Sequence, residues 1–310
     1  MDSFATKEGS IALGNMNNRV STRSTRKSKS RVPTPRKLAD SFTSRVPSKK
    51  LGEGVLEAYK EFLKESPTFF AYWKAENMAK NLKQNVVLLY DFNRVVLNGD
   101  SDYYHASYVD GFSKKGQYIL AQAPFNSATQ IDFFRMLSQT HPEAMVVMDA
   151  PDSEDMKYVF ADNGTYGSVS MSMENGDDHE GVTVRIFTVN KSKFKAYCIN
   201  GWKTDKDPPK DLVVVHEKIR STIGNNNTNL LLLVCKDGCS RCPLFCLLDI
   251  ESERIRSKGR MKFGDTIRNI RYQRSNSFDT PELFEVATSA IVELAKKNID
   301  AGAKSEIKTV

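Results

Sequence analysis

One stretch late in the chain constrains the fold more than any other, because it joins a short apolar run to a cysteine and an arginine. The run Leu230–Val234 follows a polar, asparagine-rich segment and is too short for an independent helix, which predicts a buried β-strand. Cys235 ends the run, and five residues, including Gly238, separate it from Arg241. A second apolar run after Pro243 predicts a buried helix. The predicted order is strand, tight loop, helix.

Such a loop is typical of an oxyanion site. Backbone N–H groups at a helix N-terminus attract a phosphate dianion, and a guanidinium can hold two of its oxygens. The same field lowers the pKa of a thiol, so Cys235 would be a thiolate aimed at phosphorus. We expect the thiol and the guanidinium of Arg241 to converge on one bound oxyanion, with the loop amides free to receive it.

Two other interpretations of the cysteines stay open on these residues alone. A cysteine at a strand end is usually a small buried hydrophobic residue. The spacing C-x3-C-x2-C-x3-C could instead supply ligands for an iron–sulfur cluster or a zinc ion, from Cys235, Cys239, Cys242 and Cys246. An iron–sulfur cluster with this spacing usually stands at the head of a barrel, and the last quarter or so of the chain that follows is too short for one. No second cysteine or histidine pair is present to complete a zinc site. We therefore expect no metal and no cofactor.

Composition divides the chain into three parts. With 310 residues, 40% of them hydrophobic, we expect a disordered basic tail rich in serine, threonine and arginine at 1–50, one folded domain at 51–300, and a short tail at 301–310. The tail carries a net charge of +9 against +7 for the whole chain, which leaves −2 for the remainder. The folded domain therefore lacks the basic footprint of a nucleic-acid-binding protein.

The sequence contains neither an apolar leader nor an apolar run long enough to span a membrane. Its five cysteines, four of them within twelve residues, do not resemble a secreted disulfide framework. These features predict a cytoplasmic protein without a membrane span, with the nucleus as the alternative compartment. They do not specify an oligomeric state.

Several further elements follow from the residue pattern. Apolar residues recur at helical spacing from Val55 to Leu63, and a second helix is expected after Pro67, through Phe69–Trp73. Strands are expected around 102–111 and 117–124, and a helix over 129–137. All four histidines are interpreted as surface or structural residues, because they lack metal-ligand spacing.

The order of these motifs resembles the classical protein tyrosine phosphatases from about Ala71 to Lys296. Four motifs precede the Cys-x5-Arg loop in the family's order, namely Tyr90-Asp91 with Arg94-Val95, Asp102-Tyr103-Tyr104-His105-Ala106-Ser107-Tyr108-Val109-Asp110-Gly111, Tyr118-Ile119-Leu120-Ala121-Gln122-Ala123-Pro124 and Asp132-Phe133-Phe134-Arg135-Met136. The resemblance implies an α/β (α+β) fold, with a highly twisted mixed sheet of about eight or more strands flanked by helices. It also implies a phosphotyrosine-containing protein as partner.

The resemblance assigns roles to the loop. Cys235 would be the nucleophile and would form a phosphocysteine intermediate. The equatorial phosphate oxygens would be held by Arg241 and by the loop backbone, which comprises Lys236, Asp237, Gly238, Cys239, Ser240 and Arg241. Two neighbours differ from the family: Val234 stands where a histidine precedes the cysteine, and Cys242 stands where a hydroxyl residue follows the arginine.

The family's general acid is an aspartate that follows a tryptophan and a proline in a mobile loop. Here Trp202 begins the corresponding segment, and counting without gaps places Thr204 at the acid position. A threonine cannot protonate a leaving group, and loss of general-acid catalysis costs about 10²- to 10⁴-fold in rate. Asp205 could substitute if the loop shifts by one residue, so it is a candidate catalytic residue, although an ordinary loop aspartate is the alternative.

Substrate-binding and water-positioning residues also differ. Gln84 and Val86 stand where the family has a tyrosine that stacks on phosphotyrosine and an aspartate that binds the peptide backbone. Asp279 and Leu283 replace the glutamine pair that orients the hydrolytic water.

Two function hypotheses therefore remain open. The first is a divergent tyrosine phosphatase that binds phosphotyrosine in the loop and hydrolyses it slowly. The second is a catalytically dead pseudophosphatase that acts as a phosphotyrosine-binding or scaffold module in signalling.

Overall fold

The computed structural model describes residues 67–99, 101–224 and 228–307, with side chains described as far as residue 298. The expected tail at 1–50, the expected helix at 55–63 and the last three residues lie outside this range. The proposed domain boundaries therefore stay predictions.

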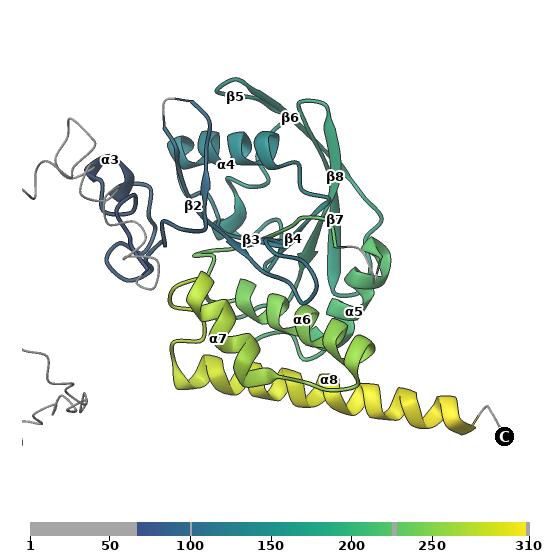
Figure 1. Cartoon of the computed structure of the whole chain (residues 1–310). Helices are drawn as coiled ribbons and strands as arrows, with labels where there is room; N and C mark the ends of the chain where they lie inside the picture. Colours follow the sequence, from purple (N-terminus) through teal and green to yellow (C-terminus); the bar gives the residue numbers. More distant parts are fainter. Residues whose placement is uncertain (1–66, 100, 225–227, 308–310) are drawn as a thin grey trace, which may run out of the picture. The chain divides into compact units, whose positions relative to one another are not determined.

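A mixed β-sheet of nine strands runs through the described part of the chain and confirms the predicted fold class (Figure 1). In space the order is β1-β2-β3-β9-β4-β8-β7-β6-β5. The strands are β1 (Arg94–Val96), β2 (Tyr103–Val109), β3 (Tyr118–Gln122), β4 (Ala144–Val147), β5 (Gly164–Tyr166), β6 (Val169–Asn175), β7 (Val182–Val189), β8 (Ser192–Ile199) and β9 (Leu231–Cys235). The four central strands β3, β9, β4 and β8 are parallel, and the outer pairs are antiparallel.

The predicted strand is β9, which lies between β3 and β4 and is buried along its whole length. Its side chains alternate between the two faces of the sheet, as the period of a strand requires. Leu231, Leu233 and Cys235 enter one hydrophobic core, whereas Leu232 and Val234 enter the other. Burial on both faces explains the continuous apolar run.

Helices cover both faces of this sheet (Figure 1). The helix α4 packs on one face, and α5, α6, α7 and α8 pack on the other. The helical segments are α3 (Ala75–Met78), α4 (Ser127–Thr140), η2 (Glu154–Met156, a 3₁₀ turn), α5 (Leu212–Ile223), α6 (Cys242–Lys258), α7 (Phe263–Gln273) and α8 (Pro281–Ile307). Pro243 lies in the first turn of α6, where its missing N–H costs no hydrogen bond.

The helix expected through Phe69–Trp73 is wrong. Residues 70–73 form turns, and α3 begins only at Ala75. The carboxylate of Asp91 accepts hydrogen bonds from the backbone N–H groups of Phe70 (2.6 Å) and Ala71 (2.9 Å). These bonds satisfy the local backbone groups from outside the segment, so a helix is not needed.

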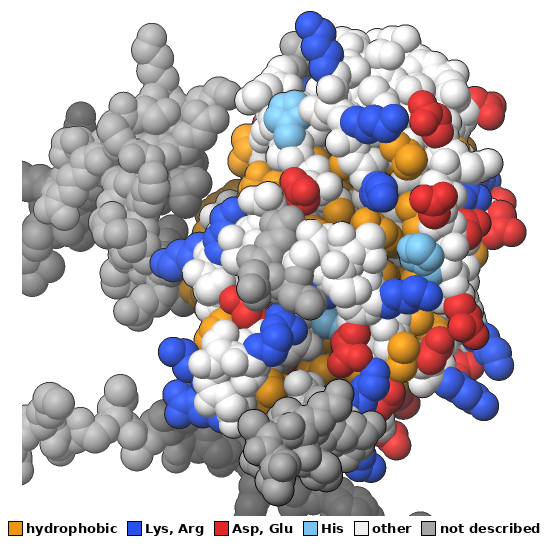
Figure 2. Space-filling view, turned by 90° about the vertical axis from the view of Figure 1, so that its right-hand side faces the viewer, with side chains coloured by type: hydrophobic (Ala, Val, Ile, Leu, Met, Phe, Trp, Pro, Cys, Tyr) orange, Lys and Arg blue, Asp and Glu red, His pale blue; other side chains and the backbone are white. Residues whose placement is uncertain are grey.

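Cationic and anionic side chains are interspersed on the face drawn in Figure 2, with hydrophobic side chains between them. Neither the positive nor the negative side chains form a continuous patch on that face. Among the residues that the structure describes, no helix has both the length and the apolar character needed to cross a bilayer.

A buried cluster of polar and charged side chains connects α5 and α6 with strand β3 of the sheet. Asp249 on α6 accepts a hydrogen bond from the Tyr118 hydroxyl (2.6 Å) and lies 2.8 Å from Arg220 and 3.3 Å from His216. Burial alone would raise the pKa of Asp249, but the hydrogen bond from His216 and the charge of Arg220 outweigh it and hold the pKa below its ordinary value. The carboxylate is therefore ionised and compensated inside the core.

We expect Asp249→Asn to lower the free energy of unfolding by about 3 kcal/mol, because it removes a buried charge that pairs with the Arg220 guanidinium. The matched control is Asp265→Asn, which removes the carboxylate that pairs with Arg268 on the surface of α7. That change should cost under about 1 kcal/mol. Urea unfolding of both variants checks this, and equal losses would contradict it.

Arg274, which follows α7, is completely buried. Its Nη2 group donates to Nδ1 of His105 on β2 at 2.9 Å. The other ring nitrogen of His105 lies 3.1 Å from the Val87 carbonyl, which can only accept. His105 is therefore the neutral tautomer with its hydrogen on Nε2. Burial, together with the charge of Arg274, lowers the pKa of His105 from 6.5 to about 3.

This depressed pKa makes stability depend on pH. Between pH 6.5 and about 3, His105 is protonated in the unfolded chain but stays neutral in the folded chain. Its contribution to the free energy of unfolding is therefore fully present above pH 6.5 and falls as the pH is lowered. We expect a loss of up to about 1.4 kcal/mol per pH unit above pH ~4.5, where carboxylates contribute little. Unfolding of His105→Asn should show a much smaller slope, whereas the exposed control His141→Asn should match the wild type. An unchanged slope in His105→Asn would refute this cause.

Candidate functional site

The loop between β9 and α6 has the shape that the sequence predicts. Gly238 adopts a positive φ of +69°, and a Cβ there would lie 2.6 Å from the Ala121 backbone and 2.5 Å from Arg274. Only glycine fits this position without strain. Beneath the loop, Arg274 donates to the carbonyls of Gly238 (3.0 Å) and Asp237 (3.1 Å). These bonds fix the loop from inside the protein.

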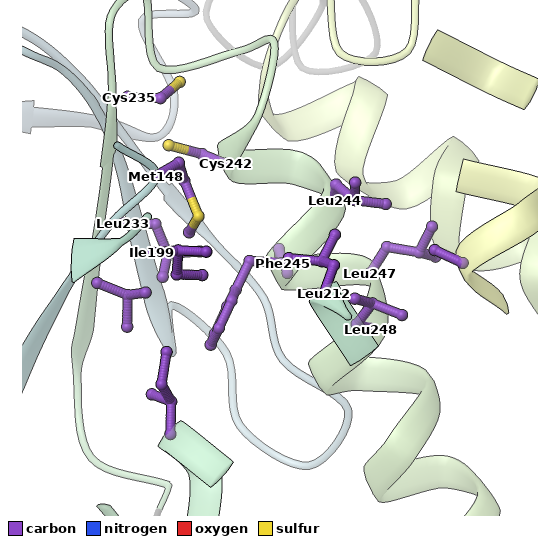
Figure 3. Close-up of a cluster of buried hydrophobic side chains, with 14 of the residues drawn as sticks. Met148, Ile199, Leu212, Leu233, Cys235, Cys242, Leu244, Phe245, Leu247 and Leu248 are labelled. Carbon is purple, nitrogen blue, oxygen red and sulfur yellow. The ribbon is translucent and has the colours of Figure 1, made fainter. Parts of the chain in front are cut away.

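Cys235 is fully buried at the end of β9, and Cys242 lies nearby at the start of α6 (Figure 3). Burial alone would raise the pKa of the Cys235 thiol. Hydrogen bonds from the Cys242 side chain and from the backbone of Cys242 and Arg241 outweigh burial, so the pKa is lowered, although the charge of Asp237 opposes this. The Cys242 side chain thus stabilises the Cys235 thiolate by a hydrogen bond, as a hydroxyl residue at this position would.

The four clustered cysteines do not form the metal site of the alternative interpretation. All are buried free thiols. Within the described ranges, no three histidine, cysteine, aspartate or glutamate side chains gather in a way that could hold a metal ion.

The carboxylate of Asp237 turns into its own loop. Its Oδ1 accepts hydrogen bonds from the backbone N–H groups of Cys239 (3.0 Å) and Ser240 (2.9 Å), and from the Ser240 hydroxyl (2.9 Å). The Cys235 sulfur lies 3.5 Å from the same oxygen. The expectation of free loop amides is therefore wrong for Cys239 and Ser240, because an internal acceptor already uses them.

Lys83 holds the second oxygen of this carboxylate. Burial would raise the pKa of Asp237, but the Lys83 ammonium and the loop N–H groups outweigh it and hold the pKa far below its ordinary value. The side chain of Asp237 is only 2% exposed. A buried, ionised carboxylate therefore uses two of the N–H groups that were expected to hold phosphate oxygens.

Arg241 is also engaged by neighbouring residues. Its Nε donates to Asp205 (2.9 Å), and its Nη1 donates to Asp149 (2.9 Å) and to the Met148 carbonyl (2.9 Å). The guanidinium lies 5.2 Å from the Trp202 ring centre. Three of its five N–H groups are thus committed to protein acceptors. Asp205, the candidate general acid, lies at the site but is paired with Arg241.

The charges around the site balance without a ligand. Lys83 pairs with Asp237, Lys236 pairs with Asp155 at 3.0 Å, and Arg241 pairs with both Asp149 and Asp205. With the Arg274 guanidinium beneath the loop, four cations therefore face four carboxylates. A phosphate dianion entering this site would meet no surplus of positive charge.

The remaining departures occupy ordinary structural positions. Thr204 forms an isolated bridge with Asp207, Val86 is exposed, and Leu283 is buried. Asp279 lies within 3.5 Å of the Asn276 amide. Sequence reasoning missed Lys83 and Asp149, which lie 154 and 92 residues from their partners in the loop. Only knowledge of the fold could have identified them.

Comparison with known proteins agrees with this fold. The human receptor-type tyrosine-protein phosphatase alpha is 25% identical over 238 residues, which cover 70% of this chain and 30% of that protein. The human epsilon form is also 25% identical, covering 67% of this chain and 33% of its own length. The chain thus spans about a third of these curated relatives.

A solved structure of PTPN18 in complex with HER2 phosphopeptides shares the fold, with a TM-score of 0.66 and 19% identity over 84% of this chain and 98% of that one. The family model for protein-tyrosine phosphatase matches residues 77–293, which is more than half of the chain. The protein therefore belongs to the protein-tyrosine phosphatase family.

Proposed function

We propose that this chain is a catalytically inactive member of the family, a pseudophosphatase that acts as a scaffold module in signalling. The observation that carries the proposal is the Asp237 carboxylate, which fills the loop that would otherwise bind phosphate. A phosphorylated substrate would have to displace an anion that Lys83 and the loop itself stabilise. Displacement would also leave that carboxylate without partners near a second anion.

The residues at the positions of the general acid and of the water-orienting groups are also poorly suited to catalysis. Thr204 carries no acidic proton, and Asp205 is committed to Arg241. The apolar Leu283 cannot position a water molecule. Because general-acid assistance and water activation each contribute to turnover, their combined loss supports an inactive domain.

A second candidate function keeps the loop as a slow phosphatase that binds phosphotyrosine proteins. It is favoured by the lowered pKa of Cys235 and by the Arg241 guanidinium close to Trp202. The structural neighbour bound to phosphopeptides offers an analogy for such a partner. Under this alternative, Asp237 would swing out when the substrate enters.

Hydrolysis of a small aryl phosphate separates the two candidates. We expect the wild type to release no more product than Cys235→Ser, because the nucleophile has no bound substrate. Product formation by the wild type that disappears in Cys235→Ser would contradict the main proposal and select the slow phosphatase.

Removing the internal carboxylate should open the loop. We expect Asp237→Ala to gain inorganic phosphate binding, seen as a rise in Tm of about 3 °C at a tenfold excess over Kd, whereas the wild type should not respond. Asp155→Ala is the matched control, since it removes the same charge from the partner of Lys236 at the rim. A wild type that responds as strongly as Asp237→Ala would show that the carboxylate does not block the loop.

A further inference from the structure

A large hollow of the described surface lies outside the Cys235–Arg241 loop. Its volume is about 930 Å³. It is lined by the loop between β2 and β3, by α6 and α7, and by residues 92–94, where β1 begins. None of its lining residues belongs to the Cys235–Arg241 segment. A ligand here would not depend on the state of that loop.

The floor of this hollow is apolar and its rim is aromatic. Ile250 and Ile270 are 5% and 1% exposed at the floor. Phe92 and Tyr272 stand at the rim with ring centres 5.4 Å apart, and they are 54% and 49% exposed. Large aromatic rings left half in water beside an apolar hollow are typical of interaction surfaces.

Asn93, in the lining of the hollow, links β2 to the end of α7. Both N–H hydrogens of the Asn93 amide are donated, to the carbonyls of Tyr108 (2.6 Å) and Gln273 (2.6 Å). Its Oδ1 is buried and has no donor among the described residues. Because this oxygen is not accessible to solvent, it is not a contact for a ligand in the hollow.

The rim charges differ from those around Cys235. Lys114 and Lys115 are exposed at the hollow, and neither forms an ion pair with any described residue. Asp110 is the acidic residue of the lining, and its carboxylate accepts a hydrogen bond from the Gly116 N–H at 2.7 Å. Two uncompensated cations therefore face the opening.

The lysine-bearing loop is held in place before any ligand arrives. The N–H of Asp110 donates to the Gln273 side chain on α7 (2.8 Å), and the N–H of Gly111 donates to the Lys114 carbonyl (2.8 Å). Less ordering entropy is therefore lost on binding.

We propose that this hollow binds an acidic linear segment of a partner protein, with one aromatic or large aliphatic side chain against Ile250 and Ile270. The carboxylates of the segment would face Lys114 and Lys115. The inference goes beyond the proposed function, because it assigns a partner class to a surface remote from the loop chemistry.

The test uses the full chain as bait for a display library of random dodecapeptides. Selected sequences should carry acidic residues next to an aromatic or large aliphatic residue. Fluorescence polarisation of labelled selected peptides should show about tenfold weaker binding to Lys114→Glu/Lys115→Glu than to the wild type. The control Lys191→Glu/Lys195→Glu makes the same charge change at exposed positions around the β7–β8 hairpin and should bind normally. An unchanged thermal midpoint establishes that both variants are folded.

Three results of the library and binding experiments would overturn the proposal. They are a library that yields no enriched sequences, enriched sequences without acidic residues, and equal affinity for both double variants. Light scattering that shows a wild-type dimer and a monomeric Lys114→Glu/Lys115→Glu variant would also overturn it, since the hollow would then bind a second copy of the chain. The hydrolysis assays above do not use this surface, so the two proposals can fail separately.

Discussion

The hydrogen bonds between the Asp237 carboxylate and its own loop determine how this site behaves. A ring of backbone N–H groups at a helix N-terminus is a strong anion trap, and it attracts a carboxylate as well as a phosphate. Here the anion is part of the ring, so its effective concentration is set by the chain and not by solution. The Lys83 ammonium completes the arrangement by neutralising the second oxygen. Two N–H groups of a loop shaped to bind an anion are thereby satisfied internally.

The support beneath the loop explains why this state is well defined. Arg274 fixes the carbonyls of Asp237 and Gly238, and the left-handed conformation of Gly238 permits the tight turn. His105 accepts from the same arginine only while it is neutral. The anion-binding shape and its structural base are therefore retained, whereas the groups for proton transfer are replaced. Such a pattern is consistent with a fold kept for binding and not for turnover.

Local patterns predicted much of the fold. The run Leu230–Val234 identified β9 because a strand buried on both faces needs uninterrupted apolar residues. The ordered motifs located β2, β3 and α4 to within a few residues. The prediction of a helix through Phe69–Trp73 was wrong, because the carboxylate of Asp91, distant in sequence, accepts hydrogen bonds from backbone N–H groups of that segment. The cytoplasmic location and the basic tail stay predictions.

The site was less predictable than the fold. The pattern Cys-x5-Arg identified the loop and its two framing residues, but it could not reveal the direction of the Asp237 side chain. That direction depends on the loop backbone and on Lys83, which is 154 residues away in sequence. The pairing of Arg241 with Asp149 likewise required the fold. A crystal structure of the wild type grown with tungstate tests the central claim most directly. We expect the Asp237 carboxylate to remain on the N–H groups of Cys239 and Ser240 with no anion in the loop. Tungstate bound above Cys235, with Asp237 turned outward, would contradict the account.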